Sequence, residues 1–178
     1  MTSRWLARAV LAAGALASIA TSAPAPQWTL STQATLPPSV LDQATVTYPL
    51  QIELGGHESF VGLEGWMTAT VRVAPRGLPD VPTEVTIRLR SLSDGPDSSY
   101  EESVSIESDA IRDVVLVARA WSQCQERSCI EDFQLEIVPG EGSTMTYDIG
   151  GTIEIDASGL DPLPVDEGDL VLRVGIQR

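Results

Sequence analysis

A group of carboxylates lies near the C-terminal end of this chain, in a segment that joins two predicted strands. The acidic residues of this segment are Asp156, Asp161, Asp166, Glu167 and Asp169. Calcium takes about six to eight oxygen ligands, from carboxylates and backbone carbonyls, in a flexible geometry. The segment could supply several of them, so we identify these residues as candidate calcium ligands. Their spacing is not that of an EF-hand, and the alternative is an ordinary solvated acidic loop.

A second acidic cluster lies in another predicted connection and comprises Asp94, Asp97, Glu101 and Glu102. Glycoside hydrolysis uses two carboxyl groups, one as the acid and one as the nucleophile or base. A small carboxylate-dependent hydrolase is therefore one alternative function. No two acidic residues are singled out for these roles by the sequence.

Aromatic side chains could line a carbohydrate-binding face, because their rings pack against the apolar faces of other rings. The candidates are Trp28, Trp66, Trp121, Tyr48, Tyr100 and Tyr147. Regular alternation with Met67 and Ala69 inward would turn Trp66 outward, whereas a bulge at Gly65 would return it to the core. Since aromatic residues are often buried, the core is the expected position of Trp66. An exposed, ligand-binding Trp66 is the alternative.

The chain has two cysteines, Cys124 and Cys129. In an exported protein a close pair predicts a disulfide bond. Closing so short a loop stabilises by about 2 kcal/mol, so the bridge would pin a turn rather than hold the fold together. The two cysteines and His57, the single histidine, are too few for a four-ligand zinc site of nitrogen and sulfur.

Several classes of enzyme are excluded by composition. The sequence contains neither lysine nor asparagine, which removes Schiff-base lysines, P-loop lysines and N-glycosylation sites. No Gly-x-Ser-x-Gly segment is present to provide a nucleophile for His57, so we interpret this histidine as a loop residue. The sequence names no catalytic residue.

The net charge of the chain is -14. A surface this acidic repels the phosphates of nucleic acids and of anionic lipids. We therefore expect no nucleic-acid partner. The acidity also keeps an exported protein in solution, which is the simplest explanation for it.

The N-terminal residues 1–22 are typical of a secretory signal peptide. Arg4 and Arg8 precede an apolar run, which is followed by small residues up to the predicted cleavage after Ser22. The apolar run is too short for a membrane span, so we expect no transmembrane segment after cleavage and a secreted or periplasmic protein. Residues 23–43 are rich in proline and predict an extended N-terminal arm, linker or edge strand. Residues 44–178 form the predicted domain.

Alternation of apolar and polar residues dominates residues 44–178. The predicted inward sets include Ala44 to Leu54, Met67 to Val73, Val85 to Leu89 and Phe133 to Ile137, taking every second residue. Eight or nine such strands and no helix predict an all-β, antiparallel two-layer β-sandwich, either immunoglobulin-like or jelly-roll-like. Residues 113–121 are apolar on both faces for a run of four residues and predict a central strand.

These patterns predict an exported, acidic, non-enzymatic β-sandwich that acts as a binding or structural module for an unknown protein or glycan. The first alternative is a calcium-assisted carbohydrate-binding or adhesion module, built on the acidic segment and an exposed Trp66. The second alternative is the small carboxylate-dependent hydrolase. No cofactor other than calcium is expected.

Overall fold

The computed structural model describes residues 28–55, 63–77, 84–92, 101–107, 110–121, 128–160 and 171–177. These residues form ten strands and no helix: β1 (Trp28–Thr35), β2 (Ser39–Leu41), β3 (Val46–Gly55), β4 (Glu64–Pro75), β5 (Glu84–Ser91), β6 (Glu101–Glu107), β7 (Arg112–Ala120), β8 (Ser128–Pro139), β9 (Tyr147–Gly159) and β10 (Val171–Ile176). Among them, no helix is long and apolar enough to cross a membrane.

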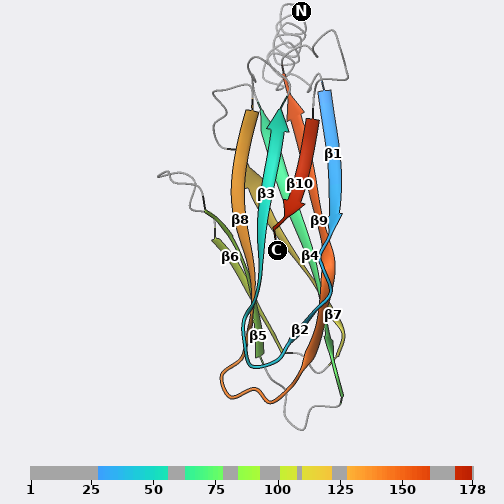
Figure 1. Ribbon diagram of the computed structural model, residues 1–178, viewed down its shortest axis with the longest axis vertical. Helices are drawn as coiled ribbons and strands as arrows, with labels where there is room; N and C mark the ends of the chain where they lie inside the picture. The colour runs from blue at the N-terminus through green and yellow to red at the C-terminus, as the bar shows by residue number, and fades with distance from the viewer. Residues whose placement is uncertain are drawn as a thin grey trace, which may run out of the picture.

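The strands form two antiparallel sheets that pack face to face (Figure 1). The first sheet has the order β1-β9-β4-β7, with β2 also paired to β9. The second sheet has the order β10-β3-β8-β5-β6. This arrangement confirms the predicted two-layer β-sandwich.

The pairing of the strands is nested. β5 pairs with β6, β4 with β7, β3 with β8, and both β1 and β2 with β9. Successive pairs lie alternately in the second and the first sheet, as if one long hairpin had been rolled up. This is the strand order of a jelly roll. β10 is an additional strand at the edge of the second sheet.

The core lies between the sheets and follows the predicted alternation. Every second residue of β3, β4, β5 and β8 is buried, including Leu50, Val71, Ile87 and Leu135. Because neighbouring side chains of a strand point to opposite faces, the other set covers the outside of the sandwich. The predicted inward residues within these strands are thus confirmed. Ala44, which was also predicted inward, precedes β3 and is exposed.

The N-terminal segment contributes more to the fold than an arm would. β1 pairs with β9 as far as Thr35, and β2 pairs with β9 again from Ser39. Pro37 and Pro38 lie between the two strands and have no N–H to donate to the sheet. Leu36, which lies between β1 and β2, is buried, and its N–H donates to the carbonyl oxygen of Gly151. The sandwich therefore extends into the segment predicted as an arm, and the described residues hold ten strands rather than eight or nine.

The prediction that residues 113–121 form a central strand is wrong. All but the last of these residues belong to β7, which is an edge strand of the first sheet. Val115 and Val117 on its outer face are 55% and 41% exposed. Branched apolar residues favour strands whether or not both faces are covered, so their presence did not reveal the position of the strand.

Pro49 lies where the pairing of β3 with β10 ends. The N–H of Gln177 donates to the Pro49 carbonyl at 2.9 Å, but proline has no N–H to return. β3 is therefore a local edge at Pro49, where β10 stops.

Candidate functional site

Trp66 lies on the outer face of the first sheet and is 48% exposed. Around Gly65 and Trp66, β4 keeps continuous register with β9 on one side and β7 on the other. No bulge turns Trp66 inward, so its expected position in the core is wrong.

A buried tryptophan explains the glycine before Trp66. A Cβ atom at Gly65 would lie 2.3 Å from Cε3 of Trp121. The indole of Trp121, which is buried, therefore occupies the space that a side chain at residue 65 would need. Gly65 lets the inner face of β4 rest directly on this ring, and regular alternation then places Trp66 outside.

A second tryptophan packs against a second glycine, on β1 and β9 of the same sheet. Trp28 of β1 is the ladder partner of Gly159 at the end of β9. A Cβ atom at Gly159 would lie 2.4 Å from Cζ2 of Trp28, which is buried. Two tryptophans thus pack on glycines at the same end of the first sheet, beneath the outer face that carries Trp66.

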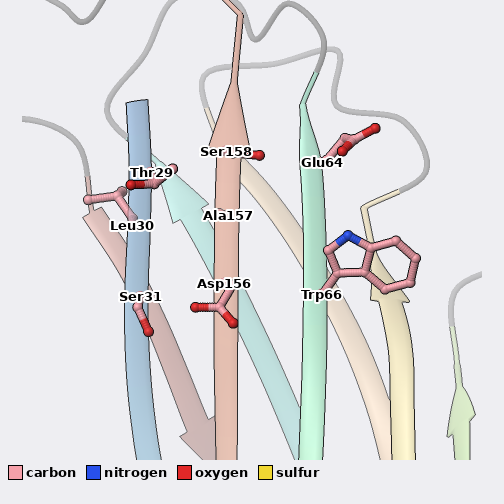
Figure 2. A pocket seen from close by; sticks show the side chains of 8 residues that line it. All are labelled: Thr29, Leu30, Ser31, Glu64, Trp66, Asp156, Ala157 and Ser158. Carbon is pink, nitrogen blue, oxygen red and sulfur yellow. The ribbon is translucent and has the colours of Figure 1, made fainter. Parts of the chain in front are cut away.

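A hollow of about 460 Å³ lies on this outer face beside Trp66, over β1, β9 and β4 (Figure 2). It is lined by Thr29, Leu30, Ser31, Glu64, Trp66, Asp156, Ala157 and Ser158. Leu30 and Ala157 belong to the inner face, so hydroxyls, two carboxylates and the indole form the exposed part of the lining. Such a lining offers several hydrogen-bonding groups around one aromatic platform.

The indole of Trp66 lies across the sheet rather than standing up from it. Figure 2 shows the ring almost face on, extending from β4 toward β7, and about half of the side chain is exposed. Glu64 lies two residues before Trp66 on the same strand. Asp156 of β9 is the ladder partner of Trp66. The exposed indole is therefore bordered by carboxylates.

The strand register places the polar side chains in a row across the sheet. Ser31 is opposite Asp156, Asp156 is opposite Trp66, and Trp66 is opposite Arg119. All four side chains are exposed. Neighbouring strands lie about 4.8 Å apart, so the row spans about 14 Å across four strands.

The polar side chains in the row through Trp66 differ from those on the outer face of the second sheet. On the second sheet they bond to one another: Gln51 to Asp132 at 3.0 Å, and Arg90 to Gln134 at 2.8 Å. Within the part of the chain that the structure describes, the side chains of Ser31, Asp156, Trp66 and Arg119 make no hydrogen bond or ion pair. Their donors and acceptors therefore face the solvent.

An ion pair lies at the opposite end of the first sheet from Trp66, between the C-terminal end of β4 and the start of β9. Nη2 of Arg76 lies 2.6 Å from Oδ1 of Asp148, and about half of each side chain is exposed. The hydrogen bond from Arg76 lowers the pKa of Asp148 below its ordinary value of 3.8. The charges of this pair are matched to each other, unlike those of the hollow.

Glu131 supports the turn that holds Trp121. Trp121 has a φ of 54°, a left-handed conformation that is unusual for a bulky residue. Its N–H donates to one carboxylate oxygen of Glu131, and the hydroxyl of Ser91 donates to the other at 3.0 Å. Glu131 is buried on the inner face of β8. It thus joins the end of β7 in the first sheet to the second sheet.

Only one of the described aromatic candidates is at the surface. Trp28, Trp121, Tyr48 and Tyr147 are all buried, so the prediction that they line a binding face is wrong. Tyr100 lies outside the described residues. Trp66 is the described aromatic residue on which an external site can be built.

The calcium prediction falls mostly on residues outside the described ranges, namely Asp161, Asp166, Glu167 and Asp169. Asp156 is described and lies in β9, in the lining of the hollow. The described residues contain no cluster of three potential metal ligands. The signal peptide, His57, Asp94, Asp97 and Cys124 also lie outside the described residues, as do the side chains of Glu101 and Glu102.

Four polar residues of the hollow were not predicted: Thr29, Ser31, Glu64 and Ser158. The first two belong to β1, which the sequence did not separate from an arm. Glu64 was detectable, because it lies two residues from Trp66 and shares its face of the strand. Ser158 needed the register of β9 with β1 and β4.

Comparison with known proteins finds no matching family model, no matching curated protein and no matching solved structure.

Proposed function

We propose that the protein is an exported, non-enzymatic binding module whose site is the hollow beside Trp66. The observation that carries the proposal is the exposed indole, bordered by Glu64 and Asp156 on the outer face of a regular sheet. A large aromatic side chain kept at the surface is costly to leave in water, and such residues often anchor ligands. Rigid strands hold the neighbouring polar groups in place around it.

Binding is favoured over hydrolysis by the exposure of both carboxylates. A general acid is usually kept in a partly dry environment that helps it to hold its proton. Glu64 and Asp156 are both exposed, and the hollow is open to the outside rather than enclosed. These carboxylates are suited to accept hydrogen bonds from a ligand.

Calcium-assisted binding is the second candidate. Asp156 belongs both to the lining of the hollow and to the predicted calcium ligands. An ion held by Asp156 and the following acidic residues would lie next to the ligand site. A rise in the melting temperature with millimolar calcium, reversed by chelator, would support this version.

Export and the disulfide bond form part of the same proposal. The sequence of residues 1–22 supports secretion into an oxidising compartment, where Cys124 and Cys129 would be bridged. Cys129 lies near the start of β8 and is 6% exposed. Mass spectrometry of the exported protein under non-reducing conditions tests both the cleavage site and the bridge.

The proposed site is tested on an array that carries glycans, peptides and lipids. We expect retention of the wild-type protein on one ligand class and loss of that retention in Trp66→Ala. The control is Ile130→Ala, which removes a side chain that is 58% exposed on the other sheet. Equal retention of both variants on every ligand would contradict the proposed site.

A further inference from the structure

The chemistry of the hollow beside Trp66 restricts the ligand further, if that hollow is the binding site. Its polar groups are the exposed hydroxyls of Thr29 and Ser31, the half-buried hydroxyl of Ser158, and the exposed carboxylates of Glu64 and Asp156. Hydroxyls donate and accept hydrogen bonds, and carboxylates accept them. This set is complementary to a ligand that presents many hydroxyl groups.

The electrostatics of the hollow exclude acidic ligands. Two carboxylates and no arginine belong to its lining, and the whole chain carries a net charge of -14. Phosphates, sulfates and uronic acids would be repelled both at the site and at a distance. The ligand is therefore uncharged or carries amino groups.

The shape of the site favours an elongated ligand that contacts one flat ring. The row from Ser31 through Asp156 and Trp66 to Arg119 crosses four strands, over about 14 Å. The half-exposed indole lies in the middle of this row (Figure 2). A sugar ring has an apolar face that packs on such a surface, while its hydroxyls point sideways to hydrogen-bonding partners.

A protein partner fits the hollow less well. Stable protein interfaces bury about 800 Å² on each side around an apolar core. The exposed apolar residues on the strands of this face are Trp66, Val40, Val115 and Val117. The valines lie on β2 and β7, outside the lining of the hollow.

We infer that the hollow binds a glycan chain without acidic groups, with one sugar ring stacked on Trp66 and neighbouring hydroxyls bonded to Asp156 and Glu64. The chain runs across the strands, along the row from Ser31 to Arg119. This inference rests on the proposed function and assigns the ligand class to the same site.

The test is calorimetric titration of the purified protein with oligosaccharides of glucose, mannose and xylose, of glucosamine, and of galacturonic acid. We expect saturable binding of at least one neutral or amine-bearing series and none of the galacturonic acid series. Trp66→Ala and Trp66→Leu should both weaken binding about tenfold or more, while Trp66→Phe retains part of it. Asp156→Asn should weaken binding less, and Ile130→Ala should leave it unchanged.

Three results would overturn the inference. They are binding of the acidic series alone, binding by Trp66→Leu as strong as wild type, and binding of no oligosaccharide. If Trp66-dependent retention on peptides or lipids persists in the array, the inference fails while the proposed binding site stands. If no ligand class depends on Trp66, both fail. Thermal melts of every variant show whether a loss of binding reflects a loss of folding.

Discussion

The indole of Trp121 fills the space above Gly65, so that a Cβ atom at residue 65 would lie 2.3 Å from Cε3 of the ring. This contact joins the buried end of β7 to the strand that carries Trp66. It links the packing of the core to the outer face, because the residue next to Gly65 is the exposed indole.

Replacing Gly65 with alanine should destabilise the protein. The added methyl group must displace the ring of Trp121, and overpacking of a filled core costs about 1–3 kcal/mol. Urea unfolding measures the change. Gly150→Ala is the matched control, because a Cβ atom at Gly150 of β9 meets no atom within 4 Å. We expect it to leave stability unchanged or slightly raised, and an equal loss in both variants would contradict the packing described.

Removing the carboxylate of Glu131 should also destabilise the fold. In Glu131→Ala the buried N–H of Trp121 and the hydroxyl of Ser91 lose their acceptor, at a cost of about 1–3 kcal/mol. Glu131→Gln keeps one carbonyl oxygen as an acceptor and should lose less. Chemical unfolding compares the three proteins. Identical stability of wild type and Glu131→Ala would show that this carboxylate does not support the turn.

The ion pair between Arg76 and Asp148 should stabilise the protein in a pH-dependent way. The hydrogen bond from Arg76 lowers the pKa of Asp148 in the folded state below its ordinary value of 3.8. The stabilisation is therefore present above the unfolded pKa and is lost as the pH falls through the lower folded pKa. Both groups are exposed, so the effect should be small and weaken with salt. NMR titration of the Asp148 carboxyl should give a midpoint below 3.8, and Arg76→Gln should return it to the ordinary value.

Tyr48 should produce the opposite dependence at alkaline pH. Burial raises its pKa above the ordinary value of 10.0, and its hydroxyl donates to the Pro37 carbonyl at 3.1 Å. The folded state keeps the proton to higher pH than the unfolded state, so stability falls as the pH rises above about 10. Tyr48→Phe should cost about 1 kcal/mol at neutral pH and flatten the alkaline decline. Absorbance of tyrosinate in the wild type minus this variant measures the shift, and a midpoint at or below 10.0 would contradict it.

The inward faces of the strands could be predicted from the sequence because a period of two is a local property. The order of the strands could not, since it depends on nested pairing between segments far apart in the chain. This is why Val115 and Val117 suggested a central strand, although β7 lies at an edge. β1 was obscured by its polar residues and by the prolines that follow it.

The exposed position of Trp66 is a part of the site that could not be predicted from the sequence. The choice between a regular strand and a bulge depended on what occupies the space at Gly65, and the occupant is Trp121, far away in sequence. The sequence Gly65-Trp66 was therefore compatible both with a regular strand and with a bulge, and only the packing of the core distinguishes the two. Glu64 could have been found from the sequence. The position of Ser31 in the site, and that of Asp156 beside Trp66, required the register across β9.

The most direct test of the proposed site is the indole N–H signal of Trp66 in an NMR titration with the neutral oligosaccharides. The signal is assigned by its absence in Trp66→Phe. We predict a saturable shift of this signal, with much smaller shifts for the buried Trp28 and Trp121. An unchanged Trp66 signal at saturating ligand would contradict binding at the hollow on the outer face of the first sheet.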